Sequence, residues 1–130
     1  MKERANFRRS LFVLSFLLAS GLAACHSYHI DTTIENRTGG AIQLLEVDYP
    51  SASFGTDRLP EGEAFHYRFQ VRGSGPLTIT YTDSGGHHIH YTGPSLVEGQ
   101  QGQLEITLLP GGKAELYPKL SPPMQPSGKN

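Results

Sequence analysis

Apolar and polar side chains alternate with a period of two over much of the chain after residue 29. Successive side chains of a strand point to opposite faces, so this alternation predicts half-buried β-strands. The strands are expected at residues 30–35, 41–49, 63–72, 77–82, 87–91, 103–109 and 113–117. The same part of the chain shows no helix-like period, so we expect no helix there.

Most of the segments between these predicted strands are short and rich in turn-forming residues. Residues 50–62 are polar and interrupted by two prolines and two glycines, so we expect a loop there. Within the second predicted strand the apolar face changes at Leu44 and Leu45, which indicates either a β-bulge or a strand buried on both sides. Pro, Ser and Lys dominate residues 118–130, so we predict a disordered Pro-rich tail.

About seven strands without a helix predict an all-β fold. The expected form is an antiparallel β-sandwich over residues 30–117, immunoglobulin-like or fibronectin-III-like in arrangement. A small, partly closed barrel is the alternative. The chain has one cysteine and no tryptophan, so it lacks the cysteine pair and core tryptophan of antibody domains. The prediction therefore concerns architecture and not membership of a family.

The first 24 residues have a different composition from the rest. Basic residues within residues 1–9 precede an apolar run over residues 11–18, and small residues then lead to Cys25, the only cysteine. A membrane-spanning helix needs about 20 apolar residues, so this run is too short to span. The order of basic, apolar and small residues is that of a secretory signal peptide.

The stretch Leu22-Ala23-Ala24-Cys25 resembles the lipobox of bacterial lipoproteins. This resemblance implies a signal peptide over residues 1–24, a lipid on the Cys25 sulfur, cleavage before Cys25 and usually acylation of the new amino group. Two or three acyl chains anchor a protein durably, whereas one holds it only marginally. The alternative is an ordinary signal peptide whose two alanines precede a cysteine by chance.

Further expectations follow from the lipoprotein resemblance. Residues 25–29 would form a short tether that keeps the domain close to the membrane. In Gram-negative bacteria an aspartate after the cysteine resembles an inner-membrane retention signal; His26 stands there in this chain, which favours the outer membrane. The mature part is also similar to short uncharacterised all-β bacterial lipoproteins, and that similarity implies no particular activity.

The charge of the mature part argues against a nucleic-acid partner. Residues 25–130 carry seven Lys and Arg against eleven Asp and Glu, a formal charge of about −4. No basic stripe is present that could replace the counterions of a phosphate backbone.

Three histidines form a candidate metal site. His88 and His90 are two residues apart and therefore share one face of a predicted strand. If that strand pairs with the strand that carries His66, three imidazoles meet, which suits Zn(II) or Cu(II). The alternative is a polar outer sheet face, because the spacing matches no fixed signature and no acidic residue is evident to orient the rings.

A second candidate is a flat binding face for a protein or polysaccharide. Arg68 and Arg72 share the outward face of one predicted strand, and Thr78 and Thr80 share a face of the next. The alternative is a solvated sheet face.

The sequence contains no Gly-x-Ser-x-Gly elbow, Ser-x-x-Lys pair or His-Glu-x-x-His helix, and an acylated Cys25 cannot act as a nucleophile. We therefore expect no enzyme and no cofactor beyond the covalent lipid. The expected role is binding or scaffolding in the cell envelope, with the membrane as a partner through the anchor. The alternative is a periplasmic zinc- or copper-binding lipoprotein that uses the histidines. The sequence does not indicate the ligand, the oligomeric state or the physiological process.

Overall fold

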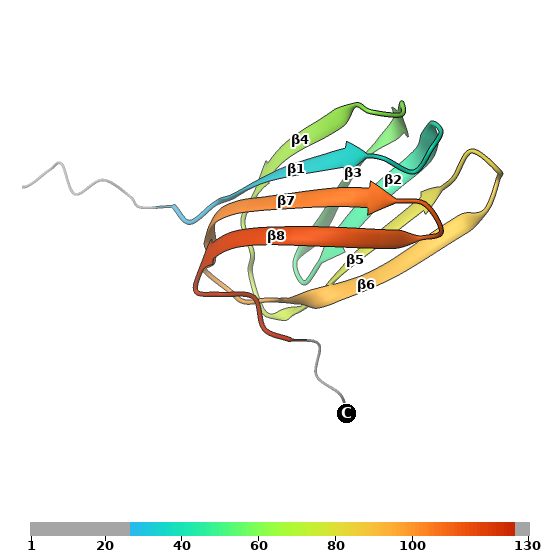
Figure 1. Cartoon of the computed structure of the whole chain (residues 1–130). Helices are drawn as coiled ribbons and strands as arrows, with labels where there is room; N and C mark the ends of the chain where they lie inside the picture. Colours follow the sequence, from blue (N-terminus) through green and yellow to red (C-terminus); the bar gives the residue numbers. More distant parts are fainter. Residues whose placement is uncertain (1–26, 127–130) are drawn as a thin grey trace, which may run out of the picture.

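The computed structural model describes residues 27–126, which form eight strands (Figure 1). The strands are β1 (Ile30–Asn36), β2 (Ile42–Tyr49), β3 (Ala52–Leu59), β4 (Ala64–Phe69), β5 (Gly75–Thr82), β6 (His88–Leu96), β7 (Gln101–Leu109) and β8 (Lys113–Ser121). No helix occurs among these residues, which confirms the prediction of an all-β fold for the described part. The predicted signal peptide, Cys25 and His26 lie outside the described residues.

The strands form two sheets of four, and the sheets face each other as layers of a sandwich (Figure 1). The first sheet has the order β4-β1-β7-β8 and the second sheet has the order β3-β2-β5-β6. β1 pairs with β7 in parallel, whereas the other neighbouring strands pair antiparallel. The prediction of a purely antiparallel sandwich is therefore wrong at this one pair.

The strand order also differs from that of an immunoglobulin domain. In an immunoglobulin domain the first two strands belong to one sheet. Here β1 lies in the first sheet and β2 in the second. The sandwich architecture predicted from the sequence is therefore present, with a different order of strands.

The apolar faces of the two sheets meet in one core. Burial of each such side chain contributes roughly 1.5–3 kcal/mol relative to exposure. The buried apolar residues are Ile30, Ile34, Ile42, Leu45, Val47, Phe54, Leu59, Phe69, Val71, Leu77, Ile79, Tyr81, Leu96, Leu104, Ile106 and Leu108. The alternation recognised in the sequence for β1, β5 and β7 matches this burial.

The prediction of a loop over residues 50–62 is wrong, because β3 occupies most of it. β3 pairs antiparallel with β2 from Tyr49↔Ala52 to Ile42↔Leu59. Gly55 is required within this strand, since a Cβ there would clash with the backbone carbonyl of Leu45. A glycine that reads as a loop signal in the sequence thus marks a close approach between two strands.

The change of face in β2 is a β-bulge, as one of the two sequence interpretations held. Gln43 pairs with Thr82 but Glu46 pairs with Thr80, so β2 contains one residue more than β5 over this span. Leu44 is the additional residue; its φ is 51° and it is 65% exposed. Leu45 returns to the core.

The sandwich extends beyond residue 117, where the sequence predicted a disordered tail. β8 continues to Ser121, and Pro118 is accommodated because β8 is an edge strand. The backbones of Ser95 and Gln125 exchange two hydrogen bonds of 2.8 and 3.0 Å. Met124 packs against the core. The prediction therefore fails over residues 118–126, and residues 127–130 lie outside the described part.

Candidate functional site

The structure brings together two of the three predicted metal-binding histidines. His88 and His90 lie on β6, at one edge of the second sheet, whereas His66 lies on β4, at an edge of the first sheet. Among the strands of residues 27–126, β4 pairs with β1 and β6 pairs with β5. The pairing on which a three-histidine site depends is therefore not present.

His88 and His90 point to the outer surface of the second sheet and are exposed. Thr82 Oγ1 lies 3.1 Å from His88 Nδ1, and Thr92 Oγ1 lies 3.3 Å from His90 Nε2. Each imidazole is thus oriented by a threonine hydroxyl through one ring nitrogen. Among residues 27–126, no group of three or more His, Cys, Asp and Glu side chains is placed to hold a metal ion.

A shallow hollow of about 320 Å³ lies beside these histidines. Its wall on the side of β2 includes Leu44, the exposed residue of the bulge, and Glu46. Thr80 forms part of its floor, because it pairs with Glu46 on one side and with His90 on the other. The hollow therefore combines imidazole, carboxylate and hydroxyl groups.

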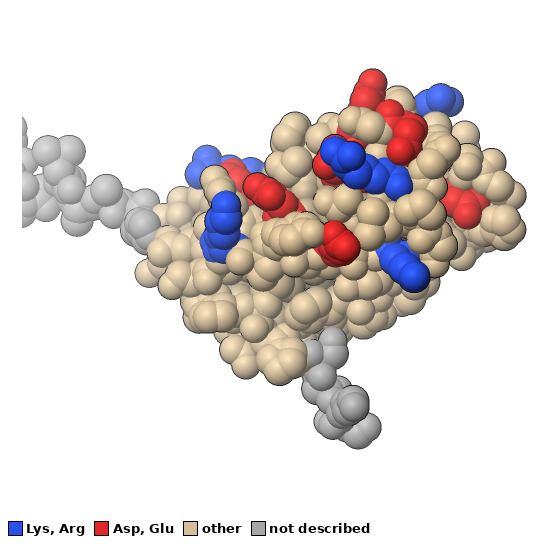
Figure 2. Space-filling view, in the orientation of Figure 1, with Lys and Arg blue, Asp and Glu red and all other residues tan. Residues whose placement is uncertain are grey.

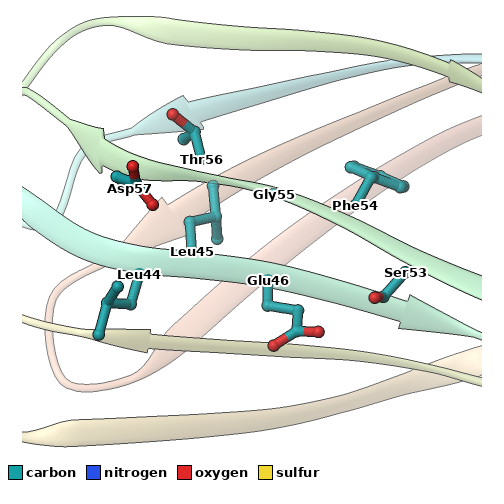
Figure 3. A pocket seen from close by; sticks show the side chains of 8 residues that line it. All are labelled: Leu44, Leu45, Glu46, Ser53, Phe54, Gly55, Thr56 and Asp57. Atoms are coloured by element: carbon teal, nitrogen blue, oxygen red, sulfur yellow. The ribbon is translucent and has the colours of Figure 1, made fainter.

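The bulge produces a second hollow, of about 390 Å³, between β2 and β3. Figure 3 shows Leu44 and Glu46 leaving β2 on one side and Leu45 on the other. Glu46 and Asp57 are the acidic residues that line this hollow, and Gly55 contributes backbone alone. Ser53 and Thr56 add two hydroxyl groups to the lining, so half of the residues around this hollow are polar.

The predicted Arg and Thr face is divided between the two sheets. Arg68 lies on β4 in the first sheet, where its Nε forms an ion pair of 3.2 Å with Asp31. Arg72 follows β4 and is exposed. Thr78 and Thr80 lie on β5 in the second sheet and are half-buried. These four residues do not form one surface.

A third hollow, of about 870 Å³, lies on the first sheet at the end where β1 begins. Its lining includes His29, Arg68 and Lys119, and also Ser27 at the start of the described residues. Gly102 allows β7 and β8 to approach closely there, since a Cβ at this position would clash with the backbone carbonyl of Lys119. The sequence analysis missed this hollow because Lys119 was assigned to a disordered tail.

An aromatic seam connects the edges of the two sheets. Its members are Tyr49, Phe54, Phe65, Tyr67 and Phe69. The rings of Phe54 and Tyr67 stack with centroids 4.4 Å apart and planes at 15°. Tyr67 is 43% exposed, so the seam presents part of an aromatic surface to solvent. The alternation in β4 predicts that Phe65, Tyr67 and Phe69 share a face, but the contact with Phe54 requires knowledge of β3.

Charged side chains are unevenly distributed over the first sheet. Figure 2 shows most acidic side chains over the half of the molecule away from the start of β1, with Lys and Arg side chains among them. Glu35 and Glu61 lie at this far end, where Glu35 pairs with Arg37 at 2.7 Å and Glu61 accepts a hydrogen bond from the Gly39 N–H. The end where β1 begins contains the basic residues Arg68 and Lys119 together with Asp31, which pairs with Arg68.

The shifted pKa values have structural causes in turns and strand edges. The backbone N–H of His87 is the largest cause that lowers the pKa of Asp83, within the turn between β5 and β6. A hydrogen bond to Glu115 raises the pKa of Tyr117 on the outer face of β8. Burial raises the pKa of Tyr81. These three pKa shifts are thus explained by a turn, a side-chain hydrogen bond and burial in the core.

Comparison with protein-family models, curated proteins and solved structures finds no match to this chain. Within residues 27–126, no helix is long and apolar enough to cross a membrane. Proposals about function therefore depend on the sequence motif at Cys25 and on the surfaces described above.

Proposed function

We propose that this chain is a lipid-anchored protein of the bacterial cell envelope with a non-enzymatic binding or structural role. The observation that supports this role most is the position of Cys25, which completes the lipobox-like sequence five residues before β1 begins at Ile30. An extended chain spans at most about 3.5 Å per residue, so the start of β1 would lie within about 17 Å of the acylated sulfur. The outer membrane is the favoured location because His26 follows the cysteine.

Cell fractionation tests the anchor. We expect the wild-type chain in the membrane fraction and the Cys25→Ser variant in the soluble fraction, because the variant lacks the sulfur that accepts the lipid. Ser27→Ala is the matched control, since it changes a nearby residue outside the lipobox-like stretch, and it should stay in the membrane fraction. Retention of Cys25→Ser in the membrane would contradict the proposed anchor.

The aromatic seam is the surface on which we place the binding of an envelope protein or polysaccharide. Tyr67 offers an exposed ring that is held flat against Phe54. Flat aromatic rings bind apolar side chains and the apolar faces of sugars. His66 and Arg68 flank Tyr67 on the opposite face of β4 and are exposed; the imidazole can donate or accept hydrogen bonds, and the guanidinium can donate them.

Site-specific photocrosslinking in intact cells tests this surface. A photoreactive phenylalanine derivative at position 67 should form an adduct with the partner. The same group at position 117 is the control, because Tyr117 is similarly exposed, at 51%, but lies on β8, away from the seam. Equal capture from both positions, or capture from position 117 alone, would argue against the aromatic seam as the binding surface.

A second candidate function is metal binding by the anchored domain. The observation in its favour is that His88 and His90 share one exposed face, each with a ring nitrogen next to a threonine hydroxyl. Zinc and copper are the metals that suit imidazole ligands. His66 has no part in this candidate, because β4 belongs to the other sheet.

A further inference from the structure

β6 is an edge strand with little of the usual protection against pairing with another chain. It has β5 on one side only. Its sequence, His88–Leu96, contains no Asp, Glu, Lys or Arg. Native edge strands are commonly protected by charged side chains, by proline, by bulges or by a covering segment. Here Pro94 and the hydrogen bonds between Ser95 and Gln125 protect only the last part of the strand.

The first part of β6 directs backbone groups away from the sheet. The Asp83 N–H donates a hydrogen bond of 2.9 Å to the carbonyl of His87. Hydrogen-bonded positions alternate along an antiparallel pair, so every second residue from His87 onward bonds to β5. The N–H and C=O groups of His88, His90 and Thr92 therefore point outward from the edge.

The two imidazoles on this edge supply half of a zinc site. Among the described residues, none lies within hydrogen-bonding distance of His88 Nε2 or His90 Nδ1, so both nitrogens are available for a metal ion. Structural zinc sites are tetrahedral, with four protein ligands. One copy supplies two imidazoles on this face, and the described residues contain no suitably placed third ligand.

A second copy of the chain supplies the missing ligands by symmetry. Two β6 strands can pair antiparallel about a two-fold axis midway between the Ile89 residues of the two copies. His88 of each copy then lies opposite His90 of the other. Both residues direct their backbone groups outward, so this register forms hydrogen bonds. Directly opposite side chains have Cβ atoms roughly 4.5–5.5 Å apart. Four imidazoles therefore meet on one face of the extended sheet.

We propose that Zn²⁺ joins two copies of this chain through β6, with His88 and His90 of each copy as its four ligands. The proposal deepens the second candidate function and rests on it. A shared sheet of eight strands would result, and the Thr82 hydroxyl, which contacts His88 Nδ1, would help to fix the orientation of the ring. The covered end of β6 at Ser95 and Gln125 limits the pairing to the first part of the strand.

Titration of the full chain in detergent micelles with zinc chloride tests the proposal. Calorimetry should give one zinc per two chains with a dissociation constant below about 10 µM. Sedimentation should show the protein mass doubling on addition of zinc and returning to the monomer value on addition of EDTA. His88→Asn and His90→Asn should abolish both effects. His66→Asn is the matched control and should preserve both, because it removes an exposed histidine of the other sheet.

A further variant separates strand pairing from metal ligation. Thr92→Lys adds a charge to the edge and keeps both histidines, so it should weaken the zinc-dependent dimer while the monomer stays folded. Thr92→Val is its control: it removes the same hydroxyl contact with His90 without adding a charge, and it should keep the dimer. Binding of one zinc per chain without a change of mass would overturn the paired site. The second candidate function, metal binding by a single chain, would then still hold. Absence of zinc binding would overturn both. A dimer that forms without zinc would overturn the role of the metal.

Discussion

Stacked aromatic rings close the sandwich between β3 and β4, whereas aliphatic side chains and glycines, with the ring of Tyr91, line the opposite edge between β6 and β8. On the first edge, Phe54 of β3 stacks on Tyr67 of β4 across the gap between the sheets. On the second edge, a Cβ at Gly93 of β6 would lie 3.6 Å from the Leu116 side chain of β8, so the Gly93 backbone and this side chain are close to van der Waals contact. A Cβ at Gly112 would lie closer still to Ile89, at 3.2 Å.

The two edges differ in what they leave accessible. The rings that span the gap between β3 and β4 expose aromatic surface to solvent, as the 43% exposure of Tyr67 shows. On the β6 edge, the accessible groups are the outward backbone groups of the strand and its two histidines. The first edge is therefore suited to side-chain recognition, and the second is suited to strand pairing.

The largest expected effect comes from removing a ring of the aromatic seam. Phe69 is buried against Tyr49, with ring centroids 4.6 Å apart. Phe69→Ala should lower the free energy of unfolding by about 3–5 kcal/mol. Leu116→Ala, at the half-buried side chain of the other edge, should cost about 1–2 kcal/mol. Urea denaturation of both variants measures the difference, and a larger loss for Leu116→Ala would reverse the comparison.

Gly55→Ala tests the close packing of the β3 edge. The added methyl group would clash with the Leu45 carbonyl, so β3 must move away from β2. We expect a loss of about 2 kcal/mol in the free energy of unfolding. Ser53→Ala, an exposed position on the same strand, is the control and should stay within about 0.5 kcal/mol of wild type. Equal values for the two variants would show that β3 tolerates the shift.

Gln100→Ala should loosen the protection of the β6 edge. The buried Gln100 side chain accepts a hydrogen bond from the Val97 N–H and donates one to the Pro122 carbonyl, both at 2.8 Å. Their loss should cost about 1–2 kcal/mol. Hydrogen exchange at the Ser95 and Gln125 amides should accelerate, whereas Gln103→Ala, at an exposed position on β7, should leave it unchanged. Unchanged exchange in Gln100→Ala would mean that other contacts hold the C-terminal segment.

Leu44→Asn should stabilise the bulge slightly. Leu44 has a φ of 51°, a conformation that costs most L-residues about 1–2 kcal/mol and that asparagine adopts more readily. Since Leu44 is exposed, little burial is lost, and we expect a gain of about 0.5 kcal/mol in thermal or urea denaturation. Gln43→Asn is the control and should give no gain. A loss of stability in Leu44→Asn would show that the leucine makes a favourable contact in the hollow.

The smallest effect concerns pH and the turn that begins β6. Hydrogen bonds from backbone N–H groups, that of His87 first, lower the pKa of Asp83. A carboxyl group with a lowered pKa contributes stability above its unfolded-state pKa, and this contribution is lost as the pH falls through the folded-state value. Asp83→Asn should therefore lower the melting temperature more at pH 7 than at about pH 2.

Asp57→Asn is the matched control for this pH dependence, because Asp57 is an exposed aspartate on β3. It should change the melting temperature less than Asp83→Asn does at pH 7. If Asp83→Asn lowered the melting temperature equally at both pH values, the contribution of its charge to the turn would be refuted.

Local alternation was sufficient to predict most strands, because burial on one face leaves its period in the sequence. Leu77, Ile79 and Tyr81 on β5 are predicted on one face and are buried together. β3 was not predicted, because the alternation is interrupted opposite the bulge and Gly55 resembles a turn signal. Pairing with β2, and not the local sequence, makes residues 52–59 a strand.

Non-local pairing also explains why the candidate sites were predicted incompletely. The alternation identifies the outward face of each strand, and the exposure of His66, His88 and His90 agrees with it. It carries no information about which sheet a strand joins. His66 and His88 therefore seemed combinable in the sequence although β4 and β6 belong to different sheets.

The inner position of β1 has a mechanical consequence for a chain held at its N-terminus. β1 is paired with β4 through six residue pairs and with β7 through seven. A pull transmitted from the proposed anchor along β1 would load both ladders in shear, which requires many hydrogen bonds to break together. An edge strand pulled away sideways would instead open one bond at a time. The anchor proposed at Cys25 would therefore act on a strand that is paired on both sides.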